Sequence, residues 1–190
     1  AYVRRACESG ADALVVGAGL PLDLPELAAA WPDVALVPIL SDARGIALVV
    51  RKWMRKGRLP DAIVIEHPRH AGGHLGAARI DDLADPRFDF ERVIPEAHAF
   101  FRAEGIDERA IPLVPAGGIN SHARLVELLA LGAAGVQLGT AFAVTEEGDA
   151  VVVTGWVRTT KDGRLADTQS RWVYRFNDDD QVVSARVERA

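Results

Sequence analysis

Three histidines and a pair of glycines stand close together in residues 66–76 (EHPRHAGGHLG). The histidines are His67, His70 and His74, and the glycines are Gly72 and Gly73. Adjacent glycines let backbone N–H groups approach a bound ring or phosphate closely, and a histidine beside them can exchange protons near neutral pH. Three such histidines also raise the question of a metal site, but no second cluster of ligands supports one and we expect no metal. A glycine-rich turn with surface histidines is the alternative that involves no ligand.

Two further strings could hold an anion. Residues 115–120 (PAGGIN) contain a glycine pair, and residues 137–140 (QLGT) end with a glycine and a threonine. Such loops expose backbone donors, the threonine adds a hydroxyl, and the N-terminus of a following helix favours negative charge. Glycines serve tight turns equally well, but two such loops in consecutive units favour a phosphate-binding cradle.

All three strings follow, or end, short apolar segments of the kind that form parallel strands covered on both faces. We expect five such strands, at residues 12–16, 35–40, 62–65, 111–114 and 135–138. Helical patterns lie between them at residues 24–30, 45–55, 91–104 and 122–131, and Ser121 is placed to cap the last helix. The repeated order of strand and helix predicts an α/β fold with a parallel sheet or part of a barrel, in which ligands bind at the carboxyl ends of the strands.

The last 41 residues have a different pattern. Segments 151–158, 169–176 and 181–188 are rich in β-branched and aromatic residues and are separated by turn signals, which predicts a three-stranded antiparallel β meander. We therefore expect two domains, residues 1–149 and residues 150–190. The second resembles the closing strands of the nuclear-transport-factor-2-like superfamily, a resemblance from which no catalytic residue is transferred.

Composition narrows the class of protein. The chain has 190 residues, 49% of them hydrophobic, and a formal net charge of −5, so neither nucleic acid nor an anionic membrane is an expected partner. Its one cysteine, Cys7, cannot form a disulfide within the chain, and no leader-like segment is seen, which makes the cytoplasm the expected location. A complete eight-stranded barrel typically needs about 250 residues, so a chain of 190 residues is expected to hold only part of one.

Taken together, the strings of residues 1–149 resemble the nitronate monooxygenase family, formerly called 2-nitropropane dioxygenases, which are FMN-dependent barrels. The resemblance rests on the order of four elements: ADALVVGAGLP near the start, AGGH-x-G at 71–76, PAGGI at 115–119 and LGAAGVQLGTAF at 131–142. It implies a partial TIM (β/α)8 barrel, in which the five predicted strands are the fourth to the eighth.

The resemblance also implies a set of site residues. His74 matches the family's active-site base, and Gly72 matches a glycine that approaches the flavin. The other implied contacts to FMN are Gly73 and His67 beside the ring, and Gly117, Gly118, Gln137, Leu138, Gly139 and Thr140 around the phosphate. The family pattern before AGGH has a Gln and then a Glu where this chain has His67 and His70, so substrate preference is expected to differ.

The implied activity is oxidation of alkyl nitronates or nitroalkanes, which are small-molecule substrates, with O2 to a carbonyl compound and nitrite. A homo-oligomer is an assembly that such a chain could form. Two alternatives stay open. One is a flavin-dependent enoyl reductase, because enoyl-acyl-carrier-protein reductases share much of the pattern. The other is a non-catalytic ligand-binding or assembly module, because an incomplete barrel has open sheet edges.

Overall fold

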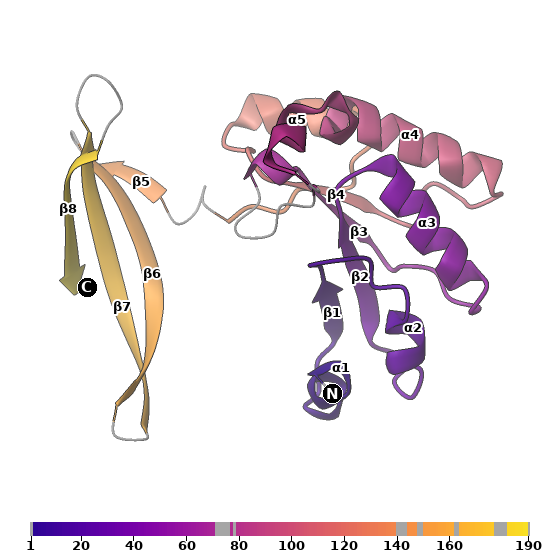
Figure 1. Ribbon diagram of the computed structural model, residues 1–190, viewed down its shortest axis with the longest axis horizontal. Helices are drawn as coiled ribbons and strands as arrows, with labels where there is room; N and C mark the ends of the chain where they lie inside the picture. Colours follow the sequence, from indigo (N-terminus) through magenta and orange to yellow (C-terminus); the bar gives the residue numbers. More distant parts are fainter. Residues whose placement is uncertain are drawn as a thin grey trace. The chain divides into compact units, whose positions relative to one another are not determined.

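The computed structural model describes residues 2–70, 77, 79–139, 144–147, 150–161, 164–176 and 182–189. The chain divides into two compact units, Ala1–Gln137 and Leu138–Ala190 (Figure 1), and each is described here by itself. None of the described helices is both long enough and apolar enough to cross a membrane.

The first unit is a four-stranded parallel sheet in the order β1-β2-β3-β4. Its strands are β1 (Ala13–Val16), β2 (Ala35–Leu40), β3 (Ile63–Glu66) and β4 (Leu113–Ala116). The helices are α1 (Tyr2–Glu8), α2 (Leu24–Leu27), α3 (Ala43–Met54), α4 (Phe90–Ala103) and α5 (His122–Ala130), with 3-10 turns η1 (Pro68–His70), η2 (Ile80–Ala84) and η3 (Pro86–Phe88). This parallel α/β arrangement confirms the predicted fold class, and four of the five predicted strands lie within two residues of their expected limits.

The fifth predicted strand, residues 135–138, is wrong as a strand. Only Gln137 makes a bridge, a parallel one to Ala116. The backbone hydrogen bonds explain why: Ala134 N donates to Leu113 O at 2.9 Å and Gln137 N to Pro115 O at 2.8 Å. The segment thus advances three positions while β4 advances two, and this slip in register prevents a regular ladder.

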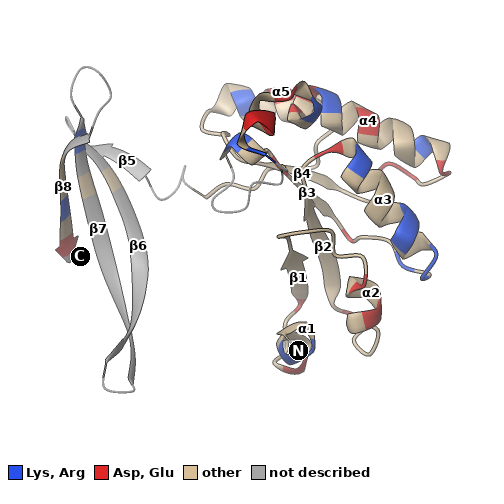
Figure 2. Ribbon diagram, viewed as in Figure 1, with Lys and Arg blue, Asp and Glu red and all other residues tan. Residues whose placement is uncertain are grey.

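Helices α3 and α4 supply most of the core through apolar residues at helical spacing. Fully buried side chains are Ile46, Val49, Val50 and Trp53 from α3, and Val93, Ile94, Ala97 and Phe101 from α4. Acidic and basic residues occupy the outer faces of the same helices (Figure 2). This division into an apolar inner face and a charged outer face is what holds the helices against the sheet.

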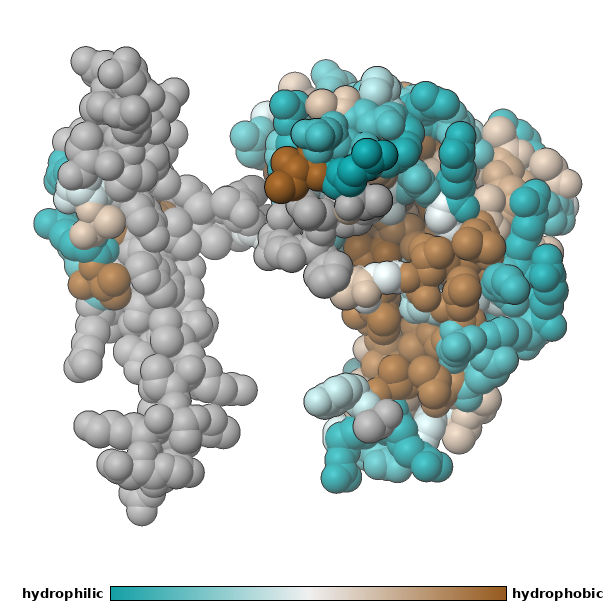
Figure 3. Space-filling model, viewed as in Figure 1, coloured by the Kyte–Doolittle hydropathy of each residue, from teal (hydrophilic) through white to brown (hydrophobic). Residues whose placement is uncertain are grey.

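The opposite face of the sheet is less covered than the sequence predicts. Along β2, Leu36 and Leu40 are buried while Val37 and Ile39 are only half-buried, and Val15 of β1 is 54% exposed. Figure 3 shows hydrophobic residues at the surface over these strands. The expectation that the strands are covered on both faces is therefore wrong for β1 and β2, because every helix packed on the sheet in this unit lies on one side of it (Figure 1).

The second unit is an antiparallel sheet in the order β5-β6-β7-β8. The strands are β5 (Val144–Glu147), β6 (Ala150–Lys161), β7 (Arg164–Phe176) and β8 (Val182–Arg189), and the predicted meander corresponds to the last three. The strand β5 was not predicted, because its four residues, VTEE, carry little apolar signal of their own. The change of family that we expect after residue 149 stays a prediction.

Candidate functional site

The carboxyl ends of β3 and β4 lie side by side and bring two of the predicted strings together. The strands pair with Glu66 opposite Ala116, their last residues. One step beyond, the backbone N–H of His67 donates to Ala116 O at 3.1 Å. The histidine string after β3 and the glycine pair after β4 therefore meet at this edge of the sheet, as the rule for parallel β/α folds requires.

The turn η1 places His70 against both glycines of the second string. Its backbone N–H donates to His67 O at 2.9 Å, which carries the side chain toward the neighbouring loop. A Cβ built on Gly117 would lie 2.9 Å from His70 Cβ, and one built on Gly118 would lie 2.8 Å from His70 Cδ2. Both glycines also have positive φ, +98° and +71°. Glycine is therefore required here by close approach as well as by backbone conformation.

His67 is enclosed, with 13% of its side chain exposed. Its Nδ1 accepts a hydrogen bond from the backbone N–H of Arg69 at 3.2 Å, which leaves the ring proton on Nε2, 3.6 Å from Asp89 Oδ1. The ring also meets that of Phe90 edge-on, with the ring centroids 5.7 Å apart. Desolvation lowers the pKa of His67 below its ordinary value of 6.5, against a smaller opposing effect of the Asp89 carboxylate, so the imidazole is neutral at pH 7.

The N-termini of α4 and α5 lie next to each other, and Phe90 at the start of α4 contacts His67. Arg124 pairs with Glu91 and lies over the ring of Phe90, 5.8 Å from its centroid. This pairing lowers the pKa of the Glu91 carboxyl. Ser121 Oγ accepts a hydrogen bond from Arg124 N at 3.2 Å, which confirms the predicted helix cap. No signal in the sequence could have linked Glu91 to Arg124, because the two are 33 positions apart.

The predicted site residues, His74 as the base and nine flavin contacts, fall into three groups. The structure brings together His67, Gly117, Gly118 and Gln137 at the edge formed by β3 and β4. Leu138 and Gly139 belong to the second unit. Gly72, Gly73, His74 and Thr140 lie outside the described residues. The roles of all ten stay predictions. Among the described residues, no group of three His, Cys, Asp or Glu side chains is placed to hold a metal ion.

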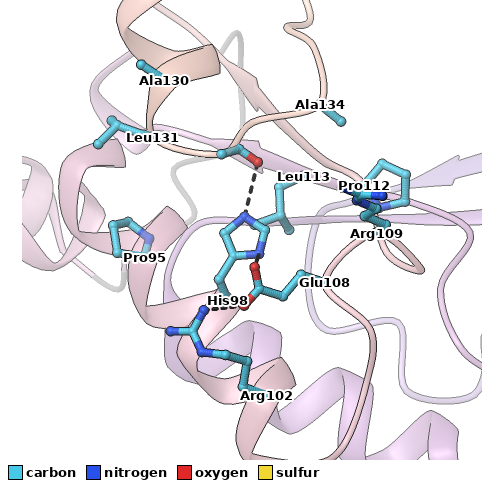
Figure 4. A pocket seen from close by; sticks show the side chains of 11 residues that line it. Pro95, His98, Arg102, Glu108, Arg109, Pro112, Leu113, Ala130, Leu131 and Ala134 are labelled. Carbon is cyan, nitrogen blue, oxygen red and sulfur yellow. Dashed lines mark hydrogen bonds and ion pairs between the residues drawn. The ribbon is translucent and has the colours of Figure 1, made fainter.

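A cavity of about 540 Å³ lies at the opposite end of β4, which begins at Leu113 (Figure 4). There His98 Nε2 lies 3.0 Å from Gly132 O, and its Nδ1 lies 3.7 Å from Glu108 Oε2, while Glu108 Oε1 pairs with Arg102. These contacts tie α4 to the loop after α5. Because β/α barrels place their chemistry at the carboxyl ends of the strands, this cavity at the amino end is structural.

Comparison with known proteins decides the family. Residues 2–168 match the sequence model of the family described as nitronate monooxygenase. The chain belongs to the nitronate monooxygenase family. The match extends beyond residue 149 into the strands of the second unit, and the resemblance of those strands to nuclear-transport-factor-2-like proteins stays a prediction.

Individual members of the family are similar over part of the chain. The probable nitronate monooxygenases of Staphylococcus haemolyticus and Bacillus subtilis are 35% identical over 89 residues and 33% identical over 88 residues. Each alignment covers 46% of this chain and 23% of the relative, so the matched segment spans about a quarter of those proteins. A solved structure of nitroalkane oxidase from Streptomyces ansochromogenes superposes with a TM-score of 0.53 at 19% identity, over 74% of this chain and 36% of that one. That likeness concerns the fold and agrees with a partial β/α barrel.

Proposed function

We propose that this protein is an FMN-binding oxidoreductase that oxidises alkyl nitronates, or nitroalkanes after loss of a proton, with O2 to a carbonyl compound and nitrite. The observation that carries the proposal is the loop at Gly117 and Gly118. It lies between the end of β4 and the capped N-terminus of α5, at the edge where β/α barrels bind phosphate groups.

The residues of this loop suit the phosphate of a flavin nucleotide. Within the described part of the chain, the backbone N–H groups of Gly117 and Gly118 have no hydrogen-bond partner. Gly118 is exposed, and a side chain at either position would collide with His70. Unpaired N–H groups near a helix N-terminus are suited to an oxyanion. Gln137 forms a bridge to Ala116 and would add to the phosphate site beside the Gly117–Gly118 loop and the N-terminus of α5.

The chain's own residues would have distinct tasks. When bound, FMN supplies the electron acceptor for oxidation of the substrate. His74, assigned from the family motif, would take the α-proton of a neutral nitroalkane, a task for which an imidazole suits near pH 7. His67 is neutral, and its Nε2–H faces Asp89. Donation from His67 to the flavin would therefore require that contact to open.

The first test is the visible spectrum of the purified full chain, with and without added FMN. Flavin absorbance or uptake supports the proposal, and failure to bind FMN contradicts it.

The second test compares His74→Ala with the unchanged protein on a nitroalkane and on its nitronate. We expect the variant to lose about 100-fold or more on the neutral nitroalkane and far less on the nitronate, because only the former needs a base. Equal losses on both would contradict the role of His74. Nicotinamide-dependent reduction of an unsaturated thioester, without nitrite formation, would instead indicate an enoyl reductase.

The open face of the first unit favours a second candidate function, that of an assembly module. Val15 is 54% exposed and Leu20 is 46% exposed, and among the described strands β1 pairs on one side only. An apolar edge of this kind is suited to pairing with another chain. Sedimentation at several concentrations tests this: Val15→Asp should abolish any dimer, whereas Leu129→Asp, at a 44% exposed position on α5, should not. A protein that remains monomeric at all concentrations would refute self-assembly.

A further inference from the structure

Glu66, the last residue of β3, carries a carboxylate that no contact within the described fold uses. Its side chain is half-buried, and it has no hydrogen-bond or ion-pair partner among the residues that the structure describes. Other carboxylates at this edge of the sheet are engaged: Asp42 caps α3, and Glu91 pairs with Arg124. Removing a carboxylate from water without giving it a partner is unfavourable. Glu66 therefore presents a charge that a ligand could neutralise.

Glu66 lies on the face of the sheet that the helices leave open. Successive side chains of a strand point to opposite faces, so Glu66 shares a face with Val64, which pairs in register with Ile39 of β2. Ile39 is half-buried and belongs to the face without helices (Figure 1). The next residue, His67, turns the other way and contacts Phe90 of α4. The two consecutive residues thus serve opposite sides of the same edge.

The neighbours of Glu66 on this face are apolar. Ala116 stands directly opposite it in β4, and Val64 precedes it by two positions, and both are buried. The chain after β1 approaches the same face, since a Cβ built on Gly17 would lie 3.2 Å from Ile39 Cδ1. A carboxylate at the border of an apolar surface suits a ligand that joins a cationic group to a short alkyl chain, and it repels an anion.

We propose that Glu66 binds a cationic group of the substrate at the carboxyl end of β3. The inference rests on the proposed function and names the substrate class, an aliphatic nitro compound that also carries a protonated amine. The ammonium group would donate hydrogen bonds to the Glu66 carboxylate, and the alkyl chain would lie over the half-buried Ile39. Glu66 is in this role a specificity-determining residue. Because a nitronate is an anion, the same carboxylate disfavours nitronates that lack a cationic group.

The experiment compares three nitro compounds with the same three-carbon chain, which ends in an ammonium, a methyl or a carboxylate group: aminonitropropane, nitrobutane and nitrobutanoate. The kcat/KM of the full chain is measured for each at neutral pH. We expect the ammonium compound to exceed nitrobutane about tenfold, chiefly through KM, and nitrobutanoate to fall below nitrobutane. Glu66→Gln should remove both differences while changing nitrobutane less than about twofold, and Glu66→Asp should keep the order of the three compounds.

The matched control is Asp33→Asn, which removes one negative charge at the opposite end of the sheet, two residues before β2 begins. Asp33 is exposed, and its loss should leave the ratios of the three compounds within about twofold of those of the unchanged protein. The inference is overturned if Glu66→Gln leaves these ratios unchanged, or if Asp33→Asn alters them as much. Glu66→Gln should also keep the midpoint of urea unfolding, because no described contact depends on its charge. A lowered midpoint would give Glu66 a structural role and overturn the inference as well.

A second measurement separates this inference from the proposed function, because it needs no turnover. Butylammonium or butanoate is titrated into the ¹⁵N-labelled full chain, and the amide resonances of Glu66 and Ile39 are followed. We expect saturating shifts with butylammonium, their loss in Glu66→Gln, and no shifts with butanoate. If the protein binds no flavin but shows this pattern, the proposed function fails and the cation site stands. If it oxidises nitro compounds but neither measurement depends on Glu66, the cation site is refuted and the proposed function survives.

Discussion

The contact between His70 and the two glycines makes a prediction that alanine substitutions can test. Gly105 has the same φ as Gly118, +71°, but a Cβ built on Gly105 has nothing within 4 Å. Gly105→Ala therefore measures the backbone strain alone, about 1–2 kcal/mol. Any additional loss of stability in Gly118→Ala reports what the new methyl group meets. At Gly117, whose φ is +98°, the additional loss also includes a difference in backbone strain.

The two contacts differ in how easily they can be relieved. At Gly118 the new Cβ would meet ring atoms of His70, and an exposed ring can rotate away. We expect Gly118→Ala to cost no more than about 0.5–1.5 kcal/mol beyond Gly105→Ala. At Gly117 the new Cβ would lie 2.9 Å from His70 Cβ, which is attached to the backbone of η1 and cannot rotate away. Gly117→Ala should therefore cost about 1–3 kcal/mol beyond Gly105→Ala.

The assay is urea unfolding of the full chain, with hydrogen exchange at the amides of β3 and β4 reporting the first unit. Combination with His70→Ala removes the ring but keeps the Cβ. It should therefore bring Gly118→Ala down to the cost of Gly105→Ala and leave most of the excess in Gly117→Ala. Combination with His70→Gly should relieve Gly117→Ala as well. If Gly117→Ala costs no more than Gly105→Ala, the turn η1 does not hold His70 against the glycine loop.

Three other predictions concern the framework around the site. Trp53 is fully buried and its Nε1–H donates to Pro21 O at 3.0 Å, so Trp53→Ala should lower the free energy of unfolding by about 3–5 kcal/mol in urea titrations, and Trp53→Phe by less. Asp42 caps α3 through a 2.7 Å hydrogen bond from Gly45 N, so Asp42→Ala should cost about 1 kcal/mol and Asp42→Asn only a fraction of that. Because desolvation lowers the pKa of His67 from 6.5, the unfolded chain takes up a proton that the folded chain does not, and stability should fall as the pH falls below about 6.5. His67→Gln should flatten this decline between pH 7.5 and 5.5, and a slope unchanged by the substitution would contradict the enclosed neutral imidazole.

The pattern of the sequence was sufficient for strands β1 to β4 and for helices α2 to α5 of the first unit, but it did not predict α1. Brief apolar runs bounded by polar residues or glycine gave the positions of β2 and β3, and Ser121 before a periodic apolar segment gave the start of α5. It failed for residues 135–138, where apolar composition is typical of a strand but the register against β4 slips by one residue. Composition carries no information about hydrogen-bond register, and this error could not have been avoided from the sequence alone.

The sequence by itself determined the chemistry available at the site: glycines after β4, histidines after β3, and an order of motifs that belongs to the nitronate monooxygenase family. Only the tertiary structure decided how the surroundings of the two histidines differ. His67 and His70 follow the same strand, but one is enclosed between Asp89 and Phe90 and the other lies exposed against the glycine loop. The cause is physical: a single 3-10 turn separates their side chains, and their neighbours come from α4 and from the loop after β4, 20 or more positions away in the sequence.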